Sequence, residues 1–196
     1  MSSSQQTSDE QLVKQAKSAM AGDARAFEAL MRRHHSYVLT NCRYLSGSAD
    51  DSKDLAQEVF VKTFFALSTF QGRSKFKTWL STIKLNHCLN FLRKKQGKHF
   101  VDVHAPELEG NHALHQEAAA EKNVAATKLR SRVEEILDEL PENLRIPVVL
   151  RDLDGMPYAE IAEQLGIGLS AVKMRIKRGR AEFRSLYDDA AMKPEN

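Results

Sequence analysis

The sequence predicts an all-α protein of two small helical domains joined by a flexible linker. Apolar residues recur every three or four positions in both halves of the 196-residue chain, and no alternating strand pattern competes with them. The helical period stops within residues 97–121. Residues 101–121 carry five acidic side chains and no Lys or Arg. Two short apolar stripes separated by Gly166 then predict a helix-turn-helix. We therefore expect domains over residues 8–96 and 122–188, with the linker between them.

Four helices are expected in the first domain, and capping residues or glycines mark their ends. In chain order, these signals are the Ser8–Gln11 capping box, the Gly22–Asp23 stop and cap, the Gly47 stop, the Ser48–Asp51 cap and the Ser74 cap. The first, third and fourth helices are expected to end at about Met20, Leu67 and Lys95.

Two helices and then the helix-turn-helix are expected in the second domain. The first helix ends at Pro141 and the second at Asp154–Gly155, because these residues interrupt the helical pattern. Pro157 suits the first turn of the next helix, where its missing N–H is not needed. The Ser170 hydroxyl can then cap the last helix by accepting a backbone hydrogen bond.

Charge is distributed unevenly over this second domain. Six basic residues stand against one acidic residue from Ser170 to Arg184, whereas Glu134–Glu163 has nine acidic residues and two basic ones. Lys173, Lys177 and Arg180 lie at spacings of four and three, opposite the apolar stripe, so the helix can pack along one edge and meet phosphate along another. A merely solvated basic helix is the alternative, and the turn and stripe before it favour DNA binding.

A second cationic stretch lies in the first domain. From Gln71 to Lys98 there are eight basic residues and no acidic residue. Aromatic and amide side chains accompany them: Phe70, Phe76, Trp79, Asn86 and Asn90. Single-stranded nucleic acid suits this mixture, because bases stack on aromatic faces while cations hold the backbone. We expect Trp79 in the core, whereas exposure is less surprising at Phe70 and Phe76, because they flank a glycine-containing loop.

No catalytic or metal-binding pattern is found. The chain has no Gly-rich phosphate loop, nucleophile elbow, paired-histidine zinc motif or Cys-x-x-Cys. Asp54 and Glu58 could form a carboxylate pair, but two like charges on a helix are more simply a solvated or partner-binding face. His104, His112 and His115 lie in the linker without a cysteine or a helix to present them. We expect no enzymatic activity, metal, cofactor or small-molecule substrate.

The chain also lacks the features of a secreted or membrane protein. No apolar run approaches the roughly eighteen residues that a membrane span needs, and the polar start MSSSQQTSDEQ contains no secretory signal. Cys42 and Cys88 fall within apolar helical patterns, so buried reduced thiols are favoured over a disulfide. We expect a cytoplasmic protein that is not inserted in a membrane.

Three segments carry a resemblance to a known family. They are DLAQEVFVKTF at 54–64, FQGRSKFKTWLSTIKLNHCLNFLRKK at 70–95, and LPENLRIPVVLRDLDGMPYAEIAEQLGIGLSAVKMRIKRGRAEFR at 140–184. Together, in this order and with this linker, they resemble a bacterial sigma factor of the sigma-70 superfamily. The resemblance is to the small extracytoplasmic-function (ECF) group, which keeps two of the family's domains. One departure is Pro157, which takes the place of a hydroxyl cap.

The resemblance implies a transcription initiation factor that binds core RNA polymerase, directs it to promoters and helps to melt the −10 region of promoter DNA. In this family the first segment docks on the clamp helices of the largest polymerase subunit, which implies contacts at Asp54, Gln57, Glu58 and Phe60. The second segment recognises the −10 element and holds a flipped base in a loop pocket, which implies contacts at Phe70, Arg73, Ser74, Lys75, Phe76, Lys77, Trp79 and Asn86. The helix-turn-helix would contact the −35 element through Ser170, Lys173, Met174, Arg175, Lys177 and Arg178.

Members of the ECF group are commonly held by an anti-sigma factor, so the resemblance also implies such a partner. The main alternative is a helix-turn-helix regulator that binds duplex DNA without polymerase. The aromatic, acid-free stretch argues against it, because such a regulator has no use for a strand-opening surface. A second alternative, an adaptor of protein partners only, does not explain the basic helix.

Overall fold

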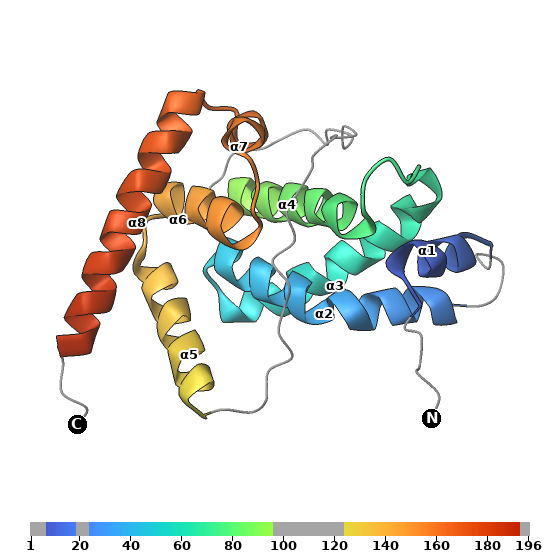
Figure 1. Cartoon of the computed structure of the whole chain (residues 1–196), viewed down its shortest axis with the longest axis horizontal. Coiled ribbons are helices and arrows are strands. Elements are labelled where there is room, and N and C mark those ends of the chain that lie inside the picture. The colour runs from blue at the N-terminus through green and yellow to red at the C-terminus, as the bar shows by residue number, and fades with distance from the viewer. Residues whose placement is uncertain (1–6, 19–23, 96–123, 193–196) are drawn as a thin grey trace. The chain divides into compact units, whose positions relative to one another are not determined.

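The computed structural model describes residues 7–18, 24–95 and 124–192, and the regular structure in these ranges is helical (Figure 1). The helices fall into two compact units. The first unit holds α1 (Asp9–Ser18), α2 (Arg25–Ser46), α3 (Ala49–Ala66), a 3₁₀ turn (Leu67–Thr69) and α4 (Phe76–Lys95). The second holds α5 (Val124–Glu139), α6 (Glu142–Val148), a π-helical turn (Val149–Leu153), α7 (Tyr158–Leu165) and α8 (Leu169–Met192). The predicted all-α fold with two helical domains is confirmed, while the domain limits stay predictions.

Three of the predicted helix ends form as the local sequence indicates. The Ser8 N–H donates to the Gln11 side chain at 2.9 Å, and the Gln11 N–H donates back to the Ser8 hydroxyl at 3.2 Å. The Asp51 N–H donates to the Ser48 hydroxyl at 3.2 Å and so caps α3. Gly47 ends α2 with a φ of 66°, a conformation that favours glycine because it has no Cβ. The expected signals at Met20 and Gly22–Asp23 lie outside the described residues.

Three other ends differ from the prediction by about one position. The Ser74 hydroxyl donates to the Lys75 carbonyl at 3.5 Å instead of capping α4, which begins at Phe76. Ser170 lies inside the first turn of α8 instead of preceding that helix. Pro157 has an extended backbone and precedes α7, so it is the residue before the first turn and not a member of it.

The first unit is built around the apolar faces of α2, α3 and α4. Val38 and Leu45 of α2, Val59 of α3 and Leu80 of α4 have no exposed surface. Fully burying side chains of this size stabilises the fold by about 1.5–3 kcal/mol each. The predicted burial of both cysteines is confirmed, and the Sγ atoms of Cys42 on α2 and Cys88 on α4 lie 3.7 Å apart. This core holds α3 and α4 in place and leaves their other faces available for binding.

The helix-turn-helix of the second unit is confirmed. Ile161 of α7 and Val172 and Ile176 of α8 are buried and join the two helices to the rest of the unit. Between them, Gly166 has a φ of 64°, and the Ile167 N–H closes the turn by donating to the carbonyl of Ala162 at 3.0 Å. The basic helix α8 therefore packs along one edge, as the sequence predicts.

Candidate nucleic-acid and protein interfaces

An acidic and polar row runs along one face of α3. Asp54, Gln57 and Glu58 are exposed, and together with Val61 and Lys62 they line a surface hollow of about 480 Å³. The structure thus brings together three of the four residues predicted for this face.

Phe60, the fourth predicted residue, does not belong to this face. It is buried at 4% exposure, and its ring is stacked beside His35 of α2 with the ring centroids 6.3 Å apart. Residues two positions apart on a helix point to different sides, so Phe60 turns inward where Glu58 turns outward. The exposed apolar side chains of α3 are instead Val61 and Phe65, at 49% and 73% exposure. The sequence-based prediction does not include Val61 and Phe65, although they follow Glu58 at spacings of three and seven and so lie on the same side of α3.

The acidic row is linked to α4 through a histidine. The Nε2 atom of His87 lies 3.0 Å from the Glu58 carboxylate, which is close enough for an ion pair. The two groups are not aligned for a hydrogen bond. Burial lowers the pKa of His87 below its ordinary value, and the nearby charge of Glu58 opposes this shift. His87 is therefore mainly neutral at pH 7.

The chain enters α4 through the loop Gln71–Lys75, called the 71–75 loop below, which is flanked by a cluster of aromatic rings. The ring centroids of Phe70 and Trp79 lie 5.0 Å apart. The ring centroid of Phe76 lies 6.1 Å from that of Phe70 and 5.9 Å from that of Trp79. Phe70 and Phe76 are buried at 7% and 2% exposure, although they flank a loop. Trp79 is half-buried. Packing between these rings is worth about 0.5–1.5 kcal/mol per pair and fixes both ends of the loop.

Cationic and polar side chains lie within this loop and on α4. Arg73 and Lys75 are exposed, and Ser74, Lys77 and Asn86 are half-buried. These five belong to the predicted −10 contact set, and the structure leaves part of each accessible. The cations Arg73 and Lys75 are thus accessible within the loop itself, while Asn86 lies further along α4.

Lys84 is the exception among the cations of this stretch. The side chain is fully buried, and its Nζ donates to the Asn41 side chain at 2.8 Å and to the Tyr37 hydroxyl at 3.4 Å. Both partners lie on α2, so the lysine stabilises the packing of α4 on α2. The surface charge of this stretch is therefore smaller than the residue count indicates.

The exposed side of α8 carries a basic row. Lys173, Lys177 and Arg178 are exposed, as is Met174 at 53%, and Arg175 is half-buried. Ser170, also predicted to contact DNA, is exposed at the start of the same helix. All six residues predicted for the −35 element thus lie on one accessible helix, which fits a helix that enters the major groove of DNA.

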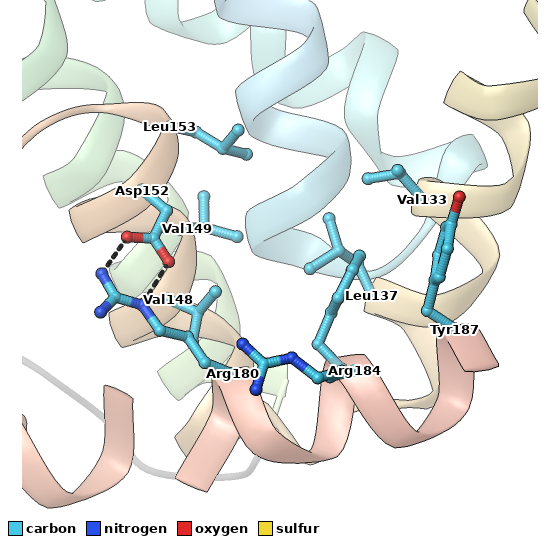
Figure 2. A pocket seen from close by; sticks show the side chains of 10 residues that line it. Val133, Leu137, Val148, Val149, Asp152, Leu153, Arg180, Arg184 and Tyr187 are labelled. Atoms are coloured by element: carbon cyan, nitrogen blue, oxygen red, sulfur yellow. Dashed lines mark hydrogen bonds and ion pairs between the residues drawn. The ribbon is translucent and has the colours of Figure 1, made fainter. Parts of the chain in front are cut away.

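Arg180, which shares the spacing of Lys173 and Lys177, is engaged inside the unit. Its Nε donates to the Asp152 carboxylate at 2.9 Å and its Nη2 donates to the second carboxylate oxygen (Figure 2). This hydrogen bond to Asp152 raises the pKa of Arg180 further above its ordinary range. Both side chains are partly exposed, so the pair contributes modestly, about 0.2–1 kcal/mol. Arg180 consequently anchors α8 and is not part of the basic row of Lys173, Lys177 and Arg178.

An apolar groove of about 580 Å³ lies beside this pair, between α5, the π-helical turn and α8 (Figure 2). Val133 and Leu137 of α5, Leu153 of the turn and Tyr187 of α8 line it. Leu153 and Tyr187 are exposed at 45% and 37%. A surface of this kind suits an apolar side chain or helix of another protein better than phosphate.

The described residues contain no group of three or more His, Cys, Asp or Glu that could hold a metal ion. The linker histidines His104, His112 and His115 lie outside these residues. Among the helices of the described ranges, none is long and apolar enough to cross a membrane.

Comparison with known proteins identifies the family. The sequence pattern of Sigma-70 region 2 matches residues 30–98, and that of Sigma-70, region 4 matches residues 130–183. The RNA polymerase sigma-H factor of Pseudomonas aeruginosa is 31% identical over 193 residues, which covers 96% of each chain. The ECF RNA polymerase sigma-E factor of Escherichia coli K12 is 34% identical over 182 residues, covering 90% of this chain and 93% of the relative. A solved structure of CnrH in complex with the cytosolic domain of CnrY is 29% identical, with a TM-score of 0.57, and covers 92% of this chain and 97% of that one. The chain therefore belongs to the sigma-70 superfamily of bacterial sigma factors, in the ECF group.

Proposed function

We propose that this sigma factor binds core RNA polymerase through the α3 face, opens the −10 region with the 71–75 loop and α4, and contacts the −35 element with α8. The observation that carries the proposal is the exposed acidic row of Asp54 and Glu58 in the same unit as the cationic loop. Carboxylates repel phosphate, so a protein that only binds duplex DNA gains nothing from such a row. A protein partner explains it.

The composition of the α3 face also favours a protein partner. Val61 and Phe65 add exposed apolar surface to the acidic row, and large apolar side chains beside charged ones are typical of the centre and rim of a protein interface. Phe60 supports the same face from beneath, because it packs between α3 and α2. We therefore propose that Val61 and Phe65, and not Phe60, contact polymerase together with Asp54, Gln57 and Glu58.

The buried aromatics give the 71–75 loop a different role from the one the sequence predicts. Phe70 and Phe76 are covered and so act beneath the loop, while the partly accessible Trp79 and Asn86 are left to meet an unpaired base. Flipping a base costs a few kcal/mol of stacking, which stacking on Trp79 and a hydrogen bond to Asn86 would offset. Arg73 and Lys75 would hold the neighbouring phosphates.

The test is transcription with purified core RNA polymerase. The chain should direct initiation from a cognate promoter and should bind the same duplex weakly on its own. Asn86→Ala should spare closed-complex binding and reduce the reactivity of −10 thymines toward a probe for unpaired bases. A premelted bubble template should restore much of the activity.

The acidic row is tested on polymerase binding itself. The double variant Asp54→Ala with Glu58→Ala should weaken association with core polymerase, whereas Glu28→Ala, which removes an exposed carboxylate from α2, should not. Unchanged association of the double variant, or tight binding to a promoter without polymerase, would instead identify a regulator that acts on duplex DNA.

We propose an anti-sigma factor as the second partner, with the apolar groove beside Arg180 as its docking surface. The relative CnrH was solved with a protein domain bound. In this chain the groove exposes Leu153, and the charges of Arg180 and Asp152 at its edge are already paired with each other. An apolar helix of a protein therefore fits the groove better than nucleic acid does. A protein that copurifies with the chain should block core association, and Leu153→Glu should weaken that block. A block equally strong on Leu153→Glu would place the partner elsewhere.

We further propose that the protein has no enzymatic activity of its own and acts in the cytoplasm, where polymerase and chromosomal DNA are found. The chemistry of initiation then belongs to polymerase. Purified chain without core polymerase should accordingly release no product from nucleoside triphosphates, and such a release would contradict the proposal.

A further inference from the structure

Helix α1 reaches the start of the 71–75 loop through a single lysine. The Lys17 ammonium donates to the carbonyl oxygen of Phe70 at 2.5 Å, across 53 positions of the sequence. Phe70 is the residue directly before the loop, and its N–H already bonds to Leu67 in the 3₁₀ turn. The lysine therefore holds the backbone at the point where the chain leaves that turn.

A second chain of contacts leads from α1 to the other end of the loop. Asp9, in the first turn of α1, accepts a hydrogen bond from Arg33 at 2.5 Å and lies 2.8 Å from the Nε2 atom of His34. The buried His34 ring packs against Phe76, with the centroids 5.4 Å apart. Phe76 is the first residue of α4, directly after the loop. The two ends of α1 thus support the two ends of one loop.

The docking of α1 does not depend on these polar contacts alone. Leu12, Val13 and Ala16 are buried, and α1 contacts α2, α4 and the 3₁₀ turn. Three buried apolar side chains hold a ten-residue helix in place without help from Lys17. A long lysine side chain would otherwise extend its ammonium into water, so its bond to Phe70 orders the loop more than it orders the helix.

We propose that α1 sets the conformation of the 71–75 loop, with Lys17 and Asp9 as positioning residues for promoter opening. The inference rests on the proposed function of this loop and deepens it. A loop that is ordered before it meets an unpaired base loses less entropy on binding it. Neither residue belongs to the proposed polymerase face or to the predicted promoter contacts, so their loss should affect opening and spare polymerase binding.

The experiment compares variants of the full chain in holoenzyme. Lys17→Met keeps the length and apolar stem of the side chain but removes the donor, and should slow open-complex formation on duplex promoter about tenfold, the loss expected for a hydrogen bond from a charged group. Lys17→Arg keeps a charged donor and should retain most of the rate. Lys14→Met removes an exposed lysine from the same helix and should behave as the original chain.

Two further readouts separate positioning from general destabilisation. A premelted bubble template should restore the activity of Lys17→Met, and its affinity for core polymerase should be unchanged. The chain has a single tryptophan, Trp79, whose ring packs on Phe70, so its fluorescence reports on the loop. The emission should change in Lys17→Met and Asp9→Asn but not in Lys14→Met.

The outcomes distinguish this inference from the proposed function. If the original chain opens the promoter and Lys17→Met opens it as fast as Lys14→Met does, α1 does not set the loop and only this inference fails. Loss of core binding in Lys17→Met, or no rescue on the bubble, would also overturn it. If the original chain itself fails to direct initiation, the proposed function fails first.

Discussion

Gly179 offers a sharp test of how α8 is positioned, because the second unit leaves no room for a side chain there. A Cβ added at this buried position would lie 2.7 Å from the Cγ2 atom of Val148 and 3.1 Å from the carbonyl oxygen of Leu144, both on α6. Carbon atoms prefer separations of about 3.5–4.0 Å. Val148 is buried and β-branched, so it cannot turn aside easily. Gly179→Ala must therefore push α8 away from α6.

The expected magnitude follows from two opposing effects. Overpacking in a well-packed core costs about 1–3 kcal/mol. Replacing glycine by alanine inside a helix contributes about 1 kcal/mol in the other direction. We expect a net loss of about 1 kcal/mol in the free energy of unfolding of the second unit, where helix propensity alone would give a gain. Gly168→Ala is the control, because a Cβ at Gly168 meets nothing within 4 Å; its effect should stay within about 0.5 kcal/mol.

The assay combines thermal unfolding with hydrogen exchange of the α8 amides, which reports on this unit separately. A loss of about 1 kcal/mol should lower the midpoint by about 4–8 °C in a domain of this size. Promoter binding by the holoenzyme should weaken as well, because Lys173, Lys177 and Arg178 lie on the displaced helix. A Gly179→Ala variant that is more stable than the original chain would refute the reasoning.

Two further predictions concern single charged residues. If Arg178 contacts a base, Arg178→Ala should weaken promoter binding by the holoenzyme by about 1–3 kcal/mol and alter sequence preference only in the −35 region. If Arg178 contacts phosphate, the loss should be equal on all promoters and the salt dependence of binding should be shallower. Unchanged promoter binding would exclude Arg178 from the interface. For Asp9, burial raises the pKa of the carboxyl, but the hydrogen bonds and charges of His34 and Arg33 outweigh burial and leave that pKa below its ordinary 3.8. Asp9 therefore stabilises the fold fully above about pH 4, and this contribution is lost as the pH falls through its folded-state pKa. In Asp9→Asn, the free energy of unfolding should accordingly fall less steeply as the pH is lowered below about 4. An unchanged pH dependence in this range would contradict the Asp9 network.

The sequence predicted the helices well because their ends depend on neighbouring residues. The Ser8–Gln11 box and the Gly47 stop need only three or four adjacent positions, and both form as expected. Ser74 and Ser170 were misplaced by about one position, because the residue that begins a helix after a loop is chosen by the packing of the loop. Such packing is not visible in a local pattern.

The predicted sites were less accurate wherever a side chain had to be assigned to a face. Phe60 and Phe65 both belong to the aromatic-rich second half of α3, and only the packing of α3 on α2 decides that the first is buried and the second exposed. Phe70 and Phe76 flank a loop, where exposure is less surprising, but each packs on the other and on Trp79. Contacts across the loop overrode its local polarity.

Lys84 shows where a usable signal existed. It stands at spacings of four from Leu80 and Cys88, both of which are fully buried, so its position on the apolar stripe of α4 indicated burial despite its charge. Burying an ammonium group is costly unless hydrogen bonds compensate it, and Tyr37 and Asn41 of α2 supply them. A lysine that must meet both partners tolerates little sliding of α4 along α2. The same contact that removes a charge from the exposed surface of α4 therefore fixes the register of this helix on α2.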